Sequence, residues 1–362
     1  MPATSCWTSF RNHFCSPATS KWVSPISSAD KTMATTTSFP SSTLPRHIPV
    51  AASETLHPKK YNANASKEHS FPGLANTPWN HQSIEQRFPA LETNTSADVV
   101  LVGDGIAGLS CALDLARGGK NVVVLEGRVR GGGQTGRTTA HLMVWLDDYY
   151  CNAINMHGVE KAKLASQSLA DDNDVIETNC TTENIECQFT RLDGILYPHT
   201  PSQISTLRKE LGACQKLGMT GVKLADLGGS DAVGRIKEAL AFPRNADFHP
   251  MMYLEGMADA VLRHGGRIFE GAKAWTVVSD RVETEQGRTV WCDAIVLATN
   301  SPINHNLAVH ARQLPYRTFA IGILCPRPAF CRADYWSTET VYHYVRADDW
   351  DEDNYLVIVG GP

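Results

Sequence analysis

The sequence lacks several features that would mark whole classes of protein. No apolar run approaches the roughly 18 residues that a membrane-spanning helix needs, and no apolar signal-peptide core follows Met1. The formal net charge at pH 7 is only -5, and no cluster of lysines or arginines stands out. Nucleic acid and anionic membranes therefore have no electrostatic support as partners, and we expect neither.

The cysteines also lack the spacings of metal sites. The ten cysteines include no C-x-x-C pair and no Cys-x-His group that could ligate zinc or an iron–sulfur cluster, so we predict no metal site. This scatter fits a reducing compartment, and we expect the cytoplasm. The first 29 residues carry Arg11 and Lys21 but no acid, which leaves the mitochondrion as the alternative location.

The composition changes abruptly near residue 95. Residues 1–95 are rich in Ser, Thr, Pro and Asn without helical or strand periodicity, which predicts a disordered N-terminal extension. From Asp98 onward, apolar runs alternate with amphipathic stretches and glycine turns. Because 42% of all residues are apolar and 20% are charged, the chain can bury the core of a soluble enzyme.

The periodicity after residue 98 predicts alternating strands and helices. The expected helices cover 106–117, 159–180, 201–217 and 250–264. The expected strands cover 98–102, 122–125, 194–197, 267–269, 275–279 and 294–298, followed by 318–324, 341–346 and 355–359. Alternating βα units predict an α/β fold with a parallel sheet, and the last three strands predict a second sheet that forms a substrate wall.

The stretch DVVLVGDGIAGLSCALDLARGGKNVVVLEG, residues 98–127, has the pattern of a dinucleotide-binding unit. An apolar strand leads into Gly103, Gly105 and Gly108, which have G-x-G-x-x-G spacing, and a helix follows. The first glycine makes the tight turn and the second lets backbone approach a phosphate. Gly108, together with Ala112, allows the helix to lie close to the sheet. The free N–H groups at the start of this helix then face a pyrophosphate.

The second strand of this unit ends at Glu126, twenty-three residues after Gly103. A carboxylate there accepts hydrogen bonds from both ribose hydroxyls and disfavours a 2′-phosphate, so NADP is not expected. Asp104 is the one discordant residue, because an anion stands next to the phosphate position. The predicted cofactor-binding residues of this unit are Gly103, Gly105, Ile106, Ala107, Gly108, Glu126 and Gly127.

A second G-x-G-x-x-G match follows in GGGQTG, residues 131–136, but no strand leads into it and no helix clearly opens after it. We treat this match as accidental and consider the segment as part of VLEGRVRGGGQTGRTTAHL.

Several motifs in order resemble the D-amino-acid oxidase (DAO) family of FAD-dependent oxidoreductases. They are the unit at 98–127, the Gly-rich segment that ends in TGRTTAHL, and DAIVLATN at 293–300. The subgroup that often carries a C-terminal Rieske domain also shares FHP, ATNSPIN, PYRT and YHYVR, and the resemblance covers about residue 68 to the end. In DAIVLATN, Asn300 replaces the usual Gly, which is tolerable because Asn visits left-handed backbone readily.

The resemblance implies FAD as cofactor and two interleaved domains. A Rossmann-like FAD-binding domain is expected at 96–150 and 245–303, and a substrate domain with a mainly antiparallel sheet at 151–244 and 304–362. Family members continue past the strand that ends here in LVIVGGP, and no Rieske ligand set is present. The expectation is therefore a substrate domain truncated at its C-terminus.

The resemblance also implies the site residues. Arg137, Thr138 and Thr139 would contact the pyrophosphate or the flavin ring, although a polar loop capped by its own hydroxyls is the alternative. From DAIVLATN, Ala298 and Thr299 join the cofactor-binding set.

Four residues are candidates for catalysis or substrate contact. His141 is placed near the flavin ring. On VYHYVRA, Tyr342, Tyr344 and Arg346 share one strand face and could bind an amino-acid carboxylate, with packing and a solvated Arg as the alternative. Arg317 is a second candidate for the same anion, and His249 is expected to start a helix.

Three hypotheses follow. The first is an FAD-dependent oxidoreductase that oxidises a CH–NH or CH–NH2 bond of a small-molecule amino acid or amine by hydride transfer to the flavin. The second is an NAD-dependent Rossmann dehydrogenase, which would leave TGRTTAHL and ATN without a role. The third is a truncated flavin-binding remnant that does not turn over. The oligomeric state is unknown from the sequence.

Overall fold

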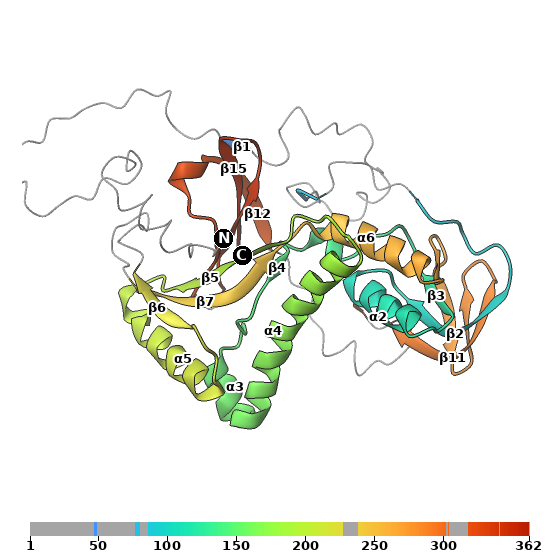
Figure 1. Ribbon diagram of the computed structural model, residues 1–362, viewed down its shortest axis with the longest axis horizontal. Coiled ribbons are helices and arrows are strands. Elements are labelled where there is room, and N and C mark those ends of the chain that lie inside the picture. Colours follow the sequence, from blue (N-terminus) through green and yellow to red (C-terminus); the bar gives the residue numbers. More distant parts are fainter. Residues whose placement is uncertain are drawn as a thin grey trace, which may run out of the picture.

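The computed structural model describes residues 47–48, 77–79, 86–226, 238–301, 303, 318–339 and 341–361. Two sheets organise this part of the chain, and they lie toward opposite ends of the molecule (Figure 1). One sheet has six strands in the order β8-β3-β2-β11-β10-β9. The other has nine, in the order β1-β12-β15-β14-β13-β5-β7-β4 with β6 paired to β7.

The six-stranded sheet contains the strands of residues 98–127, the predicted dinucleotide-binding unit. Its parallel strands are β2 (Thr95–Val102), β3 (Val122–Leu125), β8 (Arg267–Phe269) and β11 (Thr289–Leu297). An antiparallel pair, β9 (Ala274–Val278) and β10 (Arg281–Thr284), extends it beyond β11. Helices α2 (Ile106–Arg117) and α6 (Pro250–Arg263) pack together against it (Figure 1).

Alternation along β2 explains how this sheet is buried on both faces. Val99 and Leu101 join the core formed with α2 and α6, whereas Val100 and Val102 join the core under β9 and β10. Because successive side chains of a strand point to opposite faces, a continuous apolar run is what a doubly covered parallel strand requires.

The nine-stranded sheet is mainly antiparallel, as predicted. Its strands are β1 (His47–Ile48), β4 (His141–Leu142), β5 (Thr190–Tyr197), β6 (Lys223–Asp226), β7 (Glu238–Asp247), β12 (Phe319–Pro326), β13 (Asp334–Ser337), β14 (Tyr344–Asp349) and β15 (Asn354–Gly361). Among the described strands, β13 and β5 form the parallel pair, and the other pairs are antiparallel.

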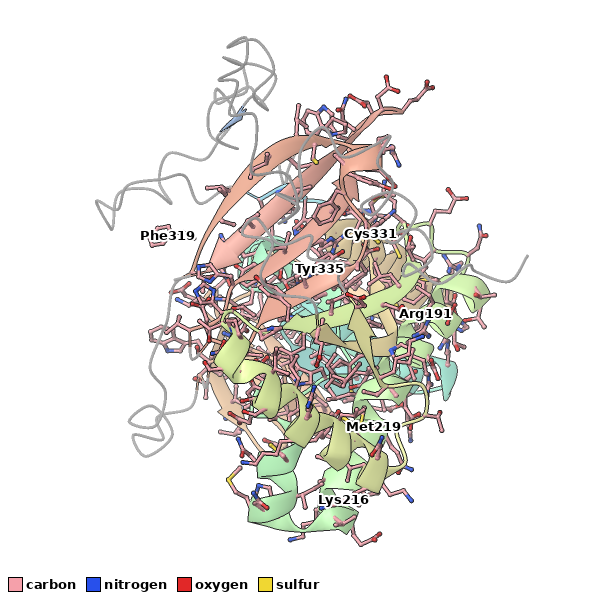
Figure 2. All side chains as sticks on the ribbon, turned by 90° about the vertical axis from the view of Figure 1, so that its left-hand side faces the viewer. Arg191, Lys216, Met219, Phe319, Cys331 and Tyr335 are labelled. Atoms are coloured by element: carbon pink, nitrogen blue, oxygen red, sulfur yellow. The ribbon has the colours of Figure 1, made fainter. Side chains whose placement is uncertain are left out.

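Three helices cover one part of this sheet, α3 (Tyr150–His157), α4 (Val159–Thr182) and α5 (Ile204–Leu217). Leu207 and Ala213 of α5 pack with Leu196, Leu240 and Phe242 of the strands. Figure 2 shows Lys216 and Met219 at the far tip of this helical layer, away from Tyr335 on β13. Short 3-10 helices complete the secondary structure: η2 (Thr135–Arg137), η3 (Pro201–Gln203) and η4 (Arg327–Ala329).

The α/β fold class and the second, mainly antiparallel sheet are confirmed. The expected strand at 341–346 is displaced, because the structure places β14 at Tyr344–Asp349. The domain boundaries stay a prediction. No helix in the described ranges combines the length and the hydropathy of a membrane span.

The predicted N-terminal disorder does not extend to residue 95, which is a correction. Trp79, Phe88 and Leu91 are buried in the two cores of the six-stranded sheet. The backbone N–H groups of Arg87 and Phe88 donate to the carboxylate of Glu270, at 2.7 and 3.2 Å. A few large apolar residues are enough to anchor this polar segment on the six-stranded sheet, although they create no helical or strand periodicity in the sequence. The rest of that prediction falls mostly outside the described residues.

Candidate functional site

The turn from Gly103 to Gly108, the nucleotide turn, has a backbone that excludes side chains at two positions. Gly103 has φ 103°, and a Cβ there would lie 2.5 Å from the carbonyl oxygen of Ala298. A Cβ on Gly108 would lie 1.9 Å from the carbonyl oxygen of Gly103. The glycines are therefore required by close backbone approach, as the sequence predicted.

Residues Ala298 and Thr299 lie against this turn. The N–H of Ala298 donates to the carbonyl of Val102 at 2.9 Å, which continues the pairing of β11 with β2 to the strand ends. Asn300, which follows, has φ 65°, so the expectation that Asn fills a left-handed position is confirmed. Two predicted motifs almost 200 residues apart thus meet at one edge of the parallel sheet.

The N-terminus of α2 has no side-chain cap from its own N-cap residue. Gly105 is an extended N-cap without a side-chain cap, and the first turn of α2 contains no acidic residue. A Cβ on Gly105 would meet Thr135 Oγ1 at 3.2 Å, and the same hydroxyl oxygen accepts a hydrogen bond from Ile106 N at 3.2 Å. Helix N–H groups and the helix dipole make this position suitable for a phosphate.

Thr135 is one of the site residues that the sequence reasoning missed, and Asp334, described below, is another. Thr135 lies in GGGQTG, where no described strand leads in and only the three-residue η2 follows, so the segment is not a second nucleotide turn. The sequence feature that could have identified Thr135 is its position in the Gly-rich segment soon after Glu126, the residue predicted to bind the ribose. The structure shows that this segment closes over the first turn instead of repeating it.

Glu126 directly follows β3, which ends at Leu125, and lies beside the nucleotide turn. Its Oε2 accepts from the N–H of Asp104 at 3.3 Å, and its Oε1 accepts from the N–H of Arg128 at 2.9 Å. Gly127 follows with little space, because a Cβ there would lie 3.3 Å from the Cβ of Lys273. The cradle of glycines, the N-terminus of α2 and this carboxylate together fit the diphosphate and ribose of a dinucleotide.

The polar side chains of the loop from Arg137 to Ala140 contact groups of the loop and of the residues next to it. Arg137 donates to the carbonyls of Gly132 and Gly133. Thr138 Oγ1 accepts from Ala140 N at 3.1 Å, and Thr139 Oγ1 lies 3.1 Å from His141 Nδ1. The alternative of a self-capped loop thus describes these side chains, and their cofactor contacts stay a prediction.

Trp79 and Arg346 fix the backbone of this loop from outside. Trp79 Nε1 donates to the carbonyl of Thr138 at 2.7 Å. The Arg346 guanidinium donates through Nη1 to the carbonyls of Thr139 and Ala140, each at 2.9 Å. The guanidinium carbon also lies 4.8 Å from the centroid of the Trp79 ring.

Arg346 therefore has a different environment from the one predicted. It is only 2% exposed, and its remaining donors contact the carbonyl of Phe248 and Oδ1 of Asp348. All five N–H groups of the guanidinium are used within the protein. In this structure, the predicted carboxylate contact has no donor left to make it. The alternative candidate, Arg317, lies outside the described residues.

His141 and Asp334 form a buried polar pair between β4 and β13. His141 Nε2 lies 3.2 Å from Asp334 Oδ1, although the two atoms are not aligned for a hydrogen bond, and both side chains are almost completely buried. Burial, and then the charge of Arg346, lower the pKa of His141 to about 3. Burial and the charge of Asp247 raise the pKa of Asp334 well above its usual range, against the opposing charges of Arg346 and Arg332.

The predicted tyrosines lie beside this pair. The Tyr344 ring centroid is 6.0 Å from that of His141, and the Tyr342 centroid is 6.3 Å from that of Tyr344. Tyr344 is the first residue of β14, while Tyr342 precedes the strand. We name His141, Asp334, Tyr342, Tyr344 and Arg346 the His141 cluster. The structure brings all four predicted catalytic candidates together there, and the roles of His141, Tyr342 and Tyr344 stay predictions.

His249 has the structural role that was expected. Its Nδ1 accepts from Met252 N at 3.2 Å, which caps the start of α6. No group of three or more His, Cys, Asp or Glu residues that could hold a metal ion occurs in the described part of the chain.

Comparisons with known proteins point to one family. The family model described as "DAO: FAD dependent oxidoreductase" matches residues 98–362. YhfW of Bacillus subtilis, named as a Rieske 2Fe-2S iron-sulfur protein, is 29% identical over 251 residues, which is 68% of this chain and 49% of that protein. Gamma-glutamylputrescine oxidoreductase of Escherichia coli is 28% identical over 190 residues, 51% of this chain and 43% of that enzyme. The chain thus spans about half the length of these relatives.

Solved structures share the fold at lower identity. Glycine oxidase from Geobacillus kaustophilus aligns with a TM-score of 0.57 and 18% identity, over 74% of this chain and 71% of that one. L-amino acid deaminase from Proteus vulgaris aligns with a TM-score of 0.57 and 17% identity, over 80% and 73%.

Proposed function

Because the chain belongs to the DAO family of FAD dependent oxidoreductases, we propose that it oxidises a CH–NH or CH–NH2 bond of an amino acid or amine by hydride transfer to FAD. The observation that carries this proposal is the nucleotide turn, closed by Thr135 and joined through residues 137–140 to the buried His141 cluster. The family model supports FAD as the cofactor and gives no support to the NAD alternative.

The names of the relatives support the substrate class. The compounds in these names, gamma-glutamylputrescine, glycine and L-amino acids, all contain an amine nitrogen bonded to a carbon that carries hydrogen. A bound flavin accepts two electrons and a proton from such a carbon. The protein then has to bind the cofactor, orient the substrate carbon and exclude water.

The chain's own residues are suited to these tasks. The nucleotide turn would hold the diphosphate and Glu126 the ribose. The His141 cluster would supply the wall of the substrate pocket, with two phenol rings and an imidazole that stays neutral at physiological pH. A neutral ring does not repel a cationic amine. Arg346 would act indirectly, by fixing the loop carbonyls of Thr139 and Ala140.

Two measurements on the purified chain test the proposal. The first is its absorption spectrum, where we expect the bands of oxidised flavin. The second is anaerobic mixing with separate amino acids and polyamines, where at least one compound should bleach those bands. A protein that neither contains nor takes up FAD contradicts the proposal. Bound FAD that no amine bleaches supports the third hypothesis, a flavin-binding remnant without turnover.

A further inference from the structure

Asp104 is the residue of the nucleotide turn that the proposed function leaves without a role. It lies between Gly103 and Gly105, where an anion is unfavourable beside a diphosphate, yet its side chain is turned inward and is only 2% exposed. Its backbone N–H donates to Oε2 of Glu126 at 3.3 Å, so the two carboxyls are neighbours and the charge of Glu126 acts on Asp104. Its Oδ2 is buried and receives no hydrogen bond from any described residue.

The charges around Asp104 are mostly negative. Glu126 approaches from the end of β3 and Glu270 from the residue after β8, while Arg130 is the nearby cation. Arg130 Nη2 pairs with Glu255 and its Nη1 lies 3.9 Å from Glu270 Oε1, while its Nε and Nη1 make no hydrogen bond to any described residue. Two carboxylates in contact repel each other when both are ionised, and a buried carboxylate oxygen without a donor costs free energy.

A proton between the two carboxyls removes both penalties. We propose that Asp104 is protonated in the FAD-bound protein and donates a hydrogen bond to Glu126, which positions that carboxylate for the ribose. Asp104 is thus a positioning residue, and the site binds FAD together with a proton. This inference rests on the proposed function only through FAD binding.

The electrostatic environment agrees with this assignment. Burial, and then the charge and hydrogen bond of Glu126, raise the pKa of Asp104 to about 8, and the charge of Arg130 offsets only part of this rise. The FAD diphosphate adds negative charge, so the pKa of Asp104 is higher with FAD bound than without it. FAD affinity is then constant below about pH 8 and falls by up to about tenfold for each pH unit above it.

The test is to titrate the apoprotein of the full chain with FAD at pH values from about 6.5 to about 9.5. Binding is measured by the quenching of flavin fluorescence. We expect the wild-type dissociation constant to rise in the alkaline half of this range. Asp104→Asn keeps a donor but cannot ionise, so its affinity should stay nearly constant with pH. Asp104→Ala loses the donor and should bind more weakly at every pH. Asp114→Asn, on the exposed surface of α2, is the matched control and should follow wild type.

A second readout does not need FAD. An acid with a raised pKa in the folded protein holds its proton there while the unfolded chain has lost it, so stability falls as pH rises between those two values. The wild-type apoprotein should therefore lose thermal stability from about pH 4 to about pH 8, and Asp104→Asn should lose less.

The outcomes separate the two ideas. FAD binding with the same affinity at every pH overturns the role of Asp104 but not the proposed function, and so does an Asp104→Asn variant that keeps the wild-type pH dependence. A wild-type apoprotein that binds no FAD at any pH overturns both.

Discussion

The nucleotide turn and the His141 cluster both serve the proposed site, but their geometry comes from different sources. The turn is formed mainly by consecutive residues, and backbone contacts such as Gly103 against Ala298 decide which residue types fit. The cluster joins β4, β13 and β14, and the hydrogen bonds of the buried Arg346 guanidinium to the carbonyls of Thr139 and Ala140 tie β14 to the loop before β4. A turn is sensitive to added volume, whereas a buried polar cluster is sensitive to lost charge or hydrogen bonds.

The largest effect is expected in the cluster, on removing the charge of Arg346. Arg346→Met leaves the carbonyls of Thr139, Ala140 and Phe248 without this donor and Asp348 without its cation. Removing one partner of a buried ion pair costs about 3–5 kcal/mol. We expect a loss of this size in the free energy of unfolding, measured by denaturant titration.

Arg208→Met is the matched control for that variant. The Arg208 side chain is 63% exposed and its ion pair with Glu238 lies on the surface, so the change should stay below about 1 kcal/mol. Equal effects of the two substitutions would mean that Arg346 does not hold the loop.

The next effect is expected in the turn, from one added methyl group. In Gly108→Ala the new Cβ lies 1.9 Å from the backbone oxygen of Gly103, so α2 or the turn has to move. We expect a loss of about 3 kcal/mol in stability and FAD affinity lower by about tenfold or more. Thermal unfolding and FAD titration measure the two effects.

Gly212→Ala, in another helix, is expected to change stability in the opposite direction. Gly212 lies within α5, and a Cβ there meets no atom within 4 Å. This substitution should stabilise the protein by about 0.5–1 kcal/mol and leave FAD affinity unchanged. If Gly108→Ala behaved in the same way, the close approach in the turn would not matter for FAD binding.

The contrast also explains what the sequence could predict. The residues of the turn and the bounds of α2 and β3 follow from local patterns, whereas Ala298 and Thr299 were assigned to the site through the family resemblance. The partners of Arg346 do not follow from local patterns, because its carbonyl acceptors come from loops whose folding leaves no side-chain pattern. Asp334 was missed for a similar reason, since a lone acid on a strand is usually solvated.

Strand β7 was missed although it lies between β5 and β6. Its sequence, EALAFPRNAD, contains Pro243 and few β-branched residues, which argues against a central strand. The structure accommodates the proline because β7 is irregular at this point. Arg244 has φ 70°, and the register with β5 shifts between Leu192 and Gly194, so the proline lies at a bulge.

A third prediction concerns pH and the His141 cluster. Because burial raises the pKa of Asp334 above that of the unfolded chain, the folded state keeps its proton at pH values where the unfolded state does not. Stability should therefore fall as pH rises above the usual aspartate range. Asp334→Asn, which stays neutral, should show a smaller fall in thermal midpoint over the same pH range.

Asp280→Asn provides the comparison for that experiment, since the Asp280 side chain is 68% exposed. It should retain the wild-type pH profile. An Asp334→Asn profile that matches wild type would mean that Asp334 is ionised in the folded protein, stabilised by Arg332 and Arg346.

The smallest effect is expected where the N-terminal segment contacts the loop of the site. Trp79→Phe removes the donor to the carbonyl of Thr138 and keeps an aromatic ring beside Arg346. One hydrogen bond contributes about 1 kcal/mol, so stability should fall by about that amount and FAD affinity by a few-fold. Trp275→Phe, at a ring that is 70% exposed, should change neither quantity. If Trp79→Phe also left both unchanged, the loop would owe its position to Arg346 alone, and the cluster would need no support from the segment before β2.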